Sequence, residues 1–216
     1  MRTYVSPIGY DTRRVTRPVI HTGLSGGDRV LLLRPGEESD TERASQTVAD
    51  VRQLLQEIEP EATVTVERVS TDEFEATVRD CCNVLDDVPT DRETIVSLGG
   101  GARDVLLPLM VAALVFDWKI DQSLFFSDLD STVREWPLPT LTEEVPTRTL
   151  RTLEEIVTTD GWLLLSEIAD ETNQSKSTVI RHVSDLEDAG MIDANTSQKS
   201  KRVRSTFSAE LFWMAR

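Results

Sequence analysis

Short apolar runs alternate with longer amphipathic segments over the first 136 residues. The runs have the length and β-branched content of strands, and they span residues 3–8, 29–33, 62–67 and 94–98. Segments with helical periodicity follow each run, at residues 11–24, 41–58, 72–85 and 102–116. Strands that alternate with helices through short connections form a parallel sheet with helices on both faces. The pattern therefore predicts an α/β, Rossmann-like fold, with two further strands at 121–126 and 132–136.

The same pattern predicts which side chains face the core. Asp11 is expected to cap the first helix, and Pro18 to break or kink it. Residues 102–116 are apolar on most sides, which predicts a buried helix. The inward face of the helix at 72–85 is expected to carry Phe74, Val78, Cys81, Cys82 and Leu85.

Three prolines interrupt the periodicity within residues 137–146, which we interpret as a linker. Beyond it the pattern predicts helices at residues 148–158, 163–171 and 175–190, then a hairpin with strands at 191–193 and 202–207. Three helices and a hairpin in this order are typical of a winged helix-turn-helix. We therefore expect a Rossmann-like domain at 1–136, the linker at 137–146 and a winged helix-turn-helix domain at 147–216.

Composition narrows the class of protein. The net charge is −15 and is spread along the chain, with only four lysines, and this composition resembles that of proteins from salt-loving archaea. At about 1 M salt the Debye length is roughly 3 Å, so only local charge patches would matter to a partner. No apolar stretch is long enough to span a membrane and no signal peptide is evident, so we expect a cytoplasmic protein with no membrane partner. The adjacent Cys81 and Cys82 predict neither a disulfide nor a metal site.

The most informative local motif is a glycine turn between the strand at 94–98 and the following helix. Gly99, Gly100 and Gly101 let the backbone approach a ligand closely, and the helix N-terminus favours an anion there. Arg103 in the first helical turn opposes the helix dipole, which a bound phosphate would explain. A tight turn with a solvated arginine explains the same residues, and both interpretations stay open at this point.

The candidate DNA-binding residues lie in the predicted winged helix. The N-terminal half of the helix at 175–190 is the part that enters the major groove in such domains. Its residues off the apolar stripe are Lys176, Ser177, Thr178, Arg181 and His182. The hairpin tip at 196–204 contains no acid and four cations, Lys199, Lys201, Arg202 and Arg204. We expect contacts with double-stranded DNA, and the alternative is a winged helix that only dimerises.

Several enzyme classes do not fit. No GxGxxG follows an early strand, and no lysine follows the glycine turn in a Walker frame. The two histidines, His21 and His182, fall in different predicted domains, so we expect neither a catalytic triad nor a metal site. Asp128 and Asp130 could hold a cation, but a polar hairpin tip explains them more simply.

The chain resembles CRISPR-associated transcription regulators that join a CARF domain to a C-terminal winged helix. The resemblance rests on the opening segment 4–11, on the glycine turn ending in Arg103 and on the domain order. It implies a homodimer that binds a cyclic oligoadenylate, with cyclic tetra-adenylate as the expected ring, across its two-fold axis. The matching ligand-binding positions are Pro7, Ile8, Gly9 and Tyr10 in the first loop, and Leu98, Gly99, Gly100, Gly101, Ala102 and Arg103 in the second.

The family often has a hydroxyl where this chain has Gly99, which shifts the expected contacts to backbone N–H groups and Arg103. We expect no enzyme activity and no cofactor besides the regulatory ring. Two other functions stay open. The Rossmann-like domain could only dimerise or sense another ligand, or the protein could be a ring nuclease that cleaves cyclic oligoadenylate.

Overall fold

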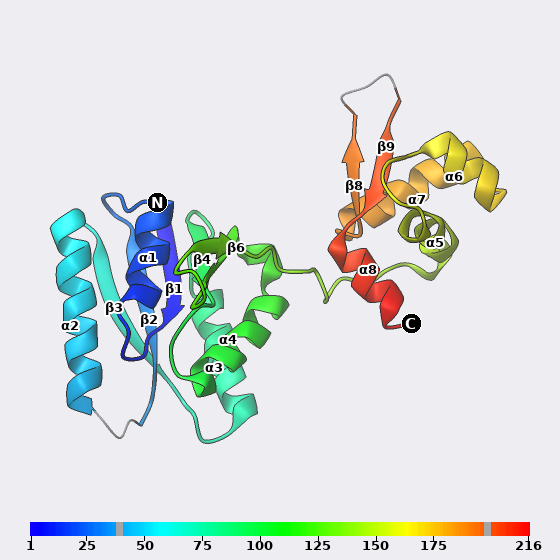
Figure 1. Cartoon of the computed structure of the whole chain (residues 1–216). Coiled ribbons are helices and arrows are strands. Elements are labelled where there is room, and N and C mark those ends of the chain that lie inside the picture. Colours follow the sequence, from blue (N-terminus) through cyan, green and yellow to red (C-terminus); the bar gives the residue numbers. More distant parts are fainter. Residues whose placement is uncertain (38–40, 197–199) are drawn as a thin grey trace. The chain divides into compact units, whose positions relative to one another are not determined.

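The computed structural model describes residues 1–37, 41–196 and 200–216, and the chain forms two compact units (Figure 1). The first unit is Met1–Leu138 and the second is Pro139–Arg216. The division falls just after the first proline of the expected linker, so residues 139–146 are part of the second unit. In the described part of the chain, no helix is both long and apolar enough to cross a membrane.

A six-stranded sheet forms the centre of the first unit, in the order β3-β2-β1-β4-β5-β6. The first five strands are parallel and β6 runs antiparallel to β5. Their bounds are β1 Arg2–Pro7, β2 Arg29–Pro35, β3 Thr63–Val69, β4 Glu93–Ser97, β5 Gln122–Phe126 and β6 Val133–Glu135. This confirms the predicted α/β, Rossmann-like parallel sheet. The strand order reverses between β1 and β4, and ligands bind beside that point in open α/β sheets.

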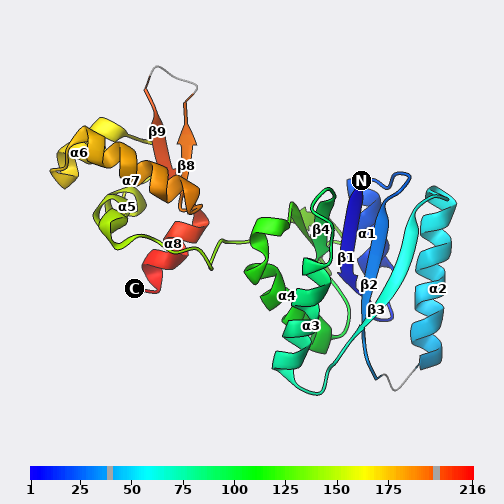
Figure 2. The same cartoon turned by 180° about the vertical axis from the view of Figure 1, so that it is seen from behind.

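Helices cover both faces of this sheet, and they can be followed from both sides in Figures 1 and 2. Tyr4 of β1 belongs to a core cluster that includes residues of α1 and α2, whereas Val5 belongs to a second cluster with residues of α3 and α4. Successive strand residues point to opposite faces, so one strand serves both cores. The helices are α1 Arg13–Thr22, α2 Thr41–Ile58, α3 Phe74–Asp86 and α4 Arg103–Val115, and a 3-10 turn, η1 Asp117–Lys119, follows α4.

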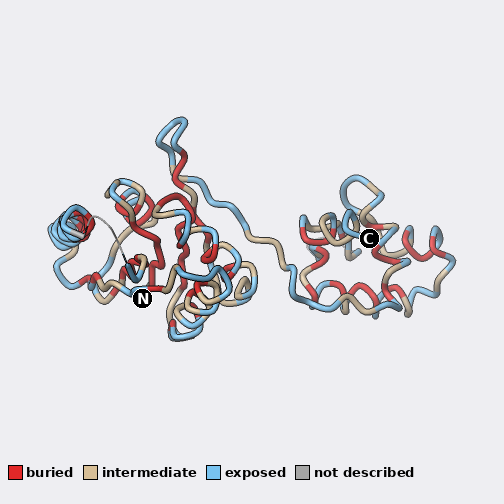
Figure 3. Tube along the Cα trace, turned by 90° about the horizontal axis from the view of Figure 1, so that it is seen from below, coloured by how far each residue is buried: buried red, intermediate tan, exposed pale blue. Residues whose placement is uncertain are grey.

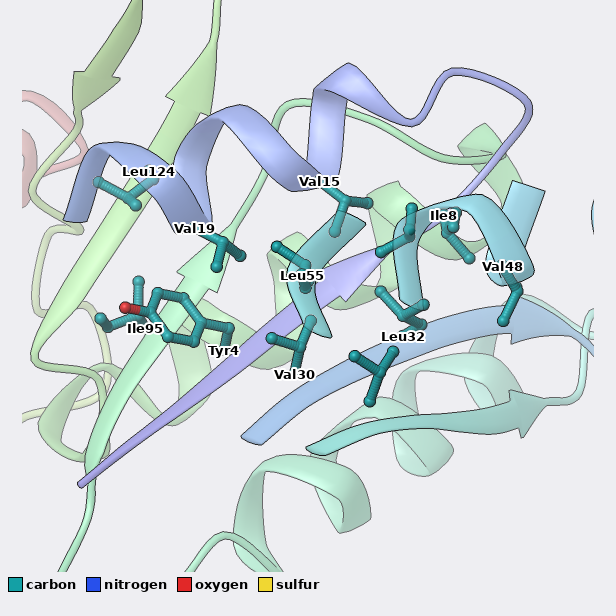
Figure 4. Packing of buried hydrophobic residues seen from close by; sticks show 12 residues of the cluster. Tyr4, Ile8, Val15, Val19, Val30, Leu32, Val48, Leu55, Ile95 and Leu124 are labelled. Atoms are coloured by element: carbon teal, nitrogen blue, oxygen red, sulfur yellow. The ribbon is translucent and has the colours of Figure 1, made fainter. Parts of the chain in front are cut away.

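The cluster beneath α1 and α2 reaches the end of β1 (Figure 4). Ile8, which follows β1, is 3% exposed and packs in this cluster with Val15 of α1 and Val48 of α2. Its N–H also donates to the carbonyl of Leu33 at 3.0 Å. The loop after β1 is therefore held in place by the core.

Three details differ from the prediction. Helix α1 begins at Arg13 with Thr12 at the N-cap, while Asp11 accepts a hydrogen bond from the Arg13 N–H at 3.1 Å in the preceding turn. Phe74 is 57% exposed. It is the first residue of α3, and a helical side chain leans toward the helix N-terminus, so it extends past the end of the helix. Helix α4 is buried on one face only, because Leu107, Val111 and Val115 are exposed.

The second unit is a small helical domain with a three-stranded sheet in the order β7-β9-β8. Its core contains Leu153, Ile168, Val183 and Val203, and in Figure 3 the buried stretches alternate with exposed ones along its helices. The predicted order of three helices and a hairpin is confirmed, and two short elements are added, β7 and α8. The elements are η2 Thr147–Thr149, α5 Leu150–Thr158, β7 Leu163–Leu164, α6 Leu165–Thr172, α7 Lys176–Asp188, β8 Ile192–Asn195, β9 Arg202–Ser205 and α8 Phe207–Met214.

Candidate functional site

A pocket of about 320 Å³ lies where β1, β2 and β4 end. The loop after β1 and the turn before α4 both contribute to it, so the structure brings the two predicted ligand loops together. Five of the ten predicted ligand residues line it, namely Ile8, Gly9, Tyr10, Gly101 and Ala102. Two residues that the sequence analysis did not select, Pro35 and Glu37, complete the lining from the end of β2.

Gly101 allows these two loops to touch. Its φ is +87°, and a Cβ at this position would lie 2.6 Å from the Cβ of Pro7. Gly9 lies against Gly101 from the other loop: a Cβ added to Gly9 would lie 3.5 Å from the Gly101 Cα. Pro7 is therefore buried beneath the turn, while Gly9 and Gly101 form the pocket wall.

Gly99 and Gly100 have a different role, because both are buried outside the pocket lining. A Cβ at Gly99 would lie 2.4 Å from the backbone nitrogen of Phe126 in β5, and one at Gly100 would lie 2.6 Å from the Cβ of Arg14. Leu98 is also buried, and its N–H donates to the carbonyl of Leu124 at 2.7 Å. These residues fix the turn, so of the motif only Gly101 and Ala102 line the pocket.

Arg14 in α1 holds the outer side of this turn. Its Nη1 donates to the carbonyl oxygen of Gly99 at 3.0 Å, and its Nη2 lies 2.8 Å from Oδ1 of Asp128. Its Nε lies 3.8 Å from Oδ2 of Asp11, and the Arg13 side chain, which hydrogen-bonds Asp11, lowers the pKa of that carboxyl. Sequence reasoning missed Arg14, since a cation in a first helical turn carries no signal of a contact 85 residues away in the chain.

Helix α4 starts at Arg103 with Ala102 at its N-cap, and no side chain caps it. Arg103 is exposed and forms no ion pair with any described residue. Leu107, Val111 and Val115 follow at four-residue spacing, so each lies next to the preceding one on the helix surface, starting from Arg103. We call these four residues the α4 stripe: a cation at the end near the pocket, then three exposed apolar side chains.

The second unit presents the N-terminal half of α7 to solvent. Ser175 caps the helix, because its Oγ accepts a hydrogen bond from the Thr178 N–H at 3.2 Å. Lys176, Ser177 and Arg181 are exposed, as predicted for a helix that enters a DNA groove, and Thr178 is half-buried. Ile180, which the sequence analysis did not select, is 57% exposed beside them.

His182 corrects one expectation. It is 4% exposed, and its Nδ1 lies 2.8 Å from Oγ1 of Thr152 in α5. Burial lowers the pKa of His182, and the charge of Arg181 lowers it further. The side chain joins two helices of the core and is not available to DNA.

The hairpin of β8 and β9 carries the predicted basic patch only in part. Lys201 forms an ion pair with Glu187 at 2.6 Å, and Arg204 forms one with Asp193 at 2.8 Å. The guanidinium of Arg204 also lies 4.8 Å from the ring centre of Trp162. Arg202 is exposed and has no ion-pair partner in the described ranges, whereas Lys199 lies outside the described residues.

In residues 1–37, 41–196 and 200–216, no three His, Cys, Asp or Glu side chains gather as metal ligands. Asp130, which the sequence analysis placed at a polar hairpin tip, is hydrogen-bonded to Thr132 and Arg134, and these bonds lower the pKa of its carboxyl. Among the residues that line the pocket, Glu37 carries the only charge.

Comparisons with solved structures give only weak similarity. Protein VC1899 from Vibrio cholerae is 12% identical, and the match covers 98% of this chain and 63% of that one, with a TM-score of 0.47. Enterococcus italicus Csm6 bound to cyclic hexa-2'-fluoro-hexa-dAMP is 11% identical, and the match covers 88% of this chain and 55% of that one, with a TM-score of 0.49. Reduced HlyU from Vibrio cholerae N16961 is 17% identical over 32% of this chain and 73% of that one, with a TM-score of 0.29. No curated protein matches the chain.

Family models give the assignment. Residues 144–203 match the MarR family, in agreement with the winged helix of the second unit. Residues 2–126 match the Csa3 CRISPR-associated Rossmann-like domain, a model that spans more than half of the 216 residues and includes both pocket loops. The protein therefore belongs to the family of the Csa3 CRISPR-associated Rossmann-like domain, here followed by a MarR-family winged helix.

Proposed function

We propose that this protein is a homodimeric transcription regulator, associated with CRISPR systems, that binds double-stranded DNA through its winged helix. A cyclic oligoadenylate, with cyclic tetra-adenylate as the first ring to test, binds the first unit and changes the affinity for DNA. The ring contacts the pocket loops, and its phosphates face the N-terminus of α4 and Arg103, where the helix dipole favours anions. The domain assignment 1–136, 137–146 and 147–216 is part of this proposal.

The α4 stripe is the observation that carries the proposal. Exposed apolar side chains on a folded surface mark an interaction site when they are contiguous, and Leu107, Val111 and Val115 are aligned on one helix. A two-fold axis running along two such helices would pair the apolar residues and place both copies of Arg103 at the same end. Two uncapped helix N-termini and two arginines beside two pockets suit a ring with several phosphates.

Calorimetric titration of the full chain with cyclic tetra-adenylate tests ring binding. We expect Arg103→Ala to weaken ring binding at least tenfold, because a hydrogen bond between an arginine and a charged phosphate contributes about 1.5–3 kcal/mol. Arg79→Ala is the matched control, since Arg79 is an exposed arginine on α3. An unchanged affinity in Arg103→Ala would contradict the proposed site.

Regulation is tested with an operator selected from random duplexes by the wild-type protein. Its affinity is then measured with and without saturating ring, because a ligand acts on DNA binding only if the two protein states differ in affinity for it. Equal affinities would leave a regulator whose first unit only dimerises or senses another ligand. Recovery of linear products from the ring would instead support a ring nuclease.

A further inference from the structure

We infer that the pocket at the ends of β1, β2 and β4 receives a nucleoside of the ring rather than a phosphate, and that Glu37 accepts a hydrogen bond from it. This rests on the proposed ring binding and adds which part of the ligand enters the pocket and which side chain selects it.

The charge of the pocket lining points to this arrangement. Among the seven lining residues only Glu37 is charged, and neither Arg14 nor Arg103 contributes to the wall. Glu37 is exposed, and its carboxylate has no hydrogen bond or ion pair with any residue that the structure describes. A phosphate beside this unpaired carboxylate would be repelled, whereas a hydroxyl or amino group would donate to it.

The other lining residues suit a nucleoside. Tyr10 is 47% exposed, and the guanidinium of Arg43 lies 4.4 Å from the centre of its ring. Aromatic side chains of this kind are stacking platforms for nucleobases. The volume of about 320 Å³ is at the lower end of the roughly 300–1,000 Å³ of small-molecule sites, which suits one nucleoside and not a whole ring.

The sheet holds the backbone that leads into Glu37. Strand β2 lies beside β1, and the Gly36 N–H donates to the carbonyl of Val69 at 2.7 Å, which holds the chain just before Glu37. An acidic residue after the second strand accepts from a ribose 2′-hydroxyl in dinucleotide-binding sheets. In an adenosine ring, that hydroxyl and the adenine amino group are the two donors with the required chemistry.

The test uses three rings: cyclic tetra-adenylate, its 2′-deoxy analogue and cyclic tetra-inosinate, in which a carbonyl replaces the adenine amino group. Each is titrated calorimetrically into the wild-type chain, Glu37→Ala, Glu37→Gln and the control Glu75→Ala, which removes an equal charge from exposed Glu75 on α3. Hydrogen exchange of β1 and β4 verifies that each variant is folded.

We expect Glu37→Ala to bind cyclic tetra-adenylate at least tenfold more weakly, as the loss of a hydrogen bond to a charged group requires. The loss of affinity in Glu37→Gln should be smaller, because the amide oxygen still accepts a hydrogen bond. The wild type should discriminate against one analogue, the deoxy ring if the donor is the hydroxyl and the inosinate ring if it is the amino group. That discrimination should vanish in Glu37→Ala.

Electrostatics alone predicts the opposite sign, because removing a negative charge favours an anionic ring. Binding by Glu37→Ala that equals or exceeds that of Glu75→Ala would therefore overturn the inference and leave the proposed function standing. A wild-type chain that binds none of the three rings would overturn the inference together with the binding of a four-membered ring on which it rests.

Discussion

At Gly99 the main chain of the turn before α4 touches the main chain of β5. An added Cβ would lie 2.4 Å from the backbone nitrogen of Phe126 and 3.0 Å from its Cα, and neither atom can move without shifting the strand. At Gly9, which lines the pocket, the nearest atom to an added Cβ is 3.5 Å away, an ordinary contact. The fold therefore has no room for a side chain at Gly99, whereas it has room for one at Gly9.

We therefore expect Gly99→Ala to lower the free energy of unfolding of the first unit by at least about 2 kcal/mol, in the range of other overpacked core sites. Gly9→Ala should leave it within about 0.5 kcal/mol of the wild type. Urea unfolding followed by hydrogen exchange of residues 1–138 measures both variants. Equal stability of the two would show that β5 moves away from the turn without cost.

Single residues also show what the sequence could and could not predict. The pairing of the two ligand loops followed from the rule that parallel strands end at one edge, and Gly9 and Gly101 do meet there. Arg14 was missed because its partners, the Gly99 carbonyl and Asp128, are distant in the chain. His182 was wrongly placed on the DNA side, although its spacing of three residues from Val179 already puts it on the buried stripe.

Among the elements, the hairpin of β8 and β9 differs most from what its sequence predicts, because its positive charge is partly paired in the fold. The sequence shows a block of cations, but the fold brings Glu187 to Lys201 and Asp193 to Arg204. Ion pairs on the surface contribute little to stability, yet these two offset two of the three described positive charges that the hairpin offers to a phosphate. Of the three described cations of the hairpin, Arg202 is the one without an acidic partner in the described part of the chain.

The salt dependence of DNA binding should follow this difference. Each phosphate neutralised by a cation adds about 0.9 to the slope of log affinity against log salt. We expect Arg202→Ala to reduce the slope by about that amount, while Arg204→Ala, which also frees Asp193, should change it less. Affinity for the selected operator is measured at several salt concentrations, with Arg79→Ala as the control. Equal slopes for Arg202→Ala and wild type would mean that Arg202 does not contact phosphate.

Helices with clear periodicity were predicted to within a few residues, and α2 at Thr41–Ile58 agrees throughout. Helix α8 was missed because its eight residues, Phe207–Met214, are mostly apolar and show no periodic pattern. The sequence nevertheless contains a residue that caps the start of α8, since Thr206 Oγ1 accepts a hydrogen bond from the Ala209 N–H. The apolar residues on the outer face of α4 led to the prediction of a helix buried within one chain. A sequence does not distinguish such a helix from one that is buried against a second copy of the chain.

For the whole molecule, assembly and ligand binding depend on the same helix. The α4 stripe begins with Arg103 beside the pocket and continues with Leu107, Val111 and Val115. If these side chains form the seam of a dimer, a ring that bridges two pockets requires an intact seam. A single chain that binds the ring without a partner would not require the seam. One substitution in the seam therefore shows whether ring binding depends on the dimer.

Val111→Glu places a charge in the middle of the stripe, where its burial at a seam would cost several kcal/mol. We expect the wild type to sediment as a dimer of two 24.2 kDa chains and to bind one ring per two chains. Val111→Glu should sediment as a monomer and lose ring binding at least a hundredfold. Ile58→Glu, at a similarly exposed apolar residue of α2, controls for the added charge and should keep both properties. A monomeric Val111→Glu that still binds one ring per chain would place the whole site within one protomer and remove the role of the stripe in ligand recognition.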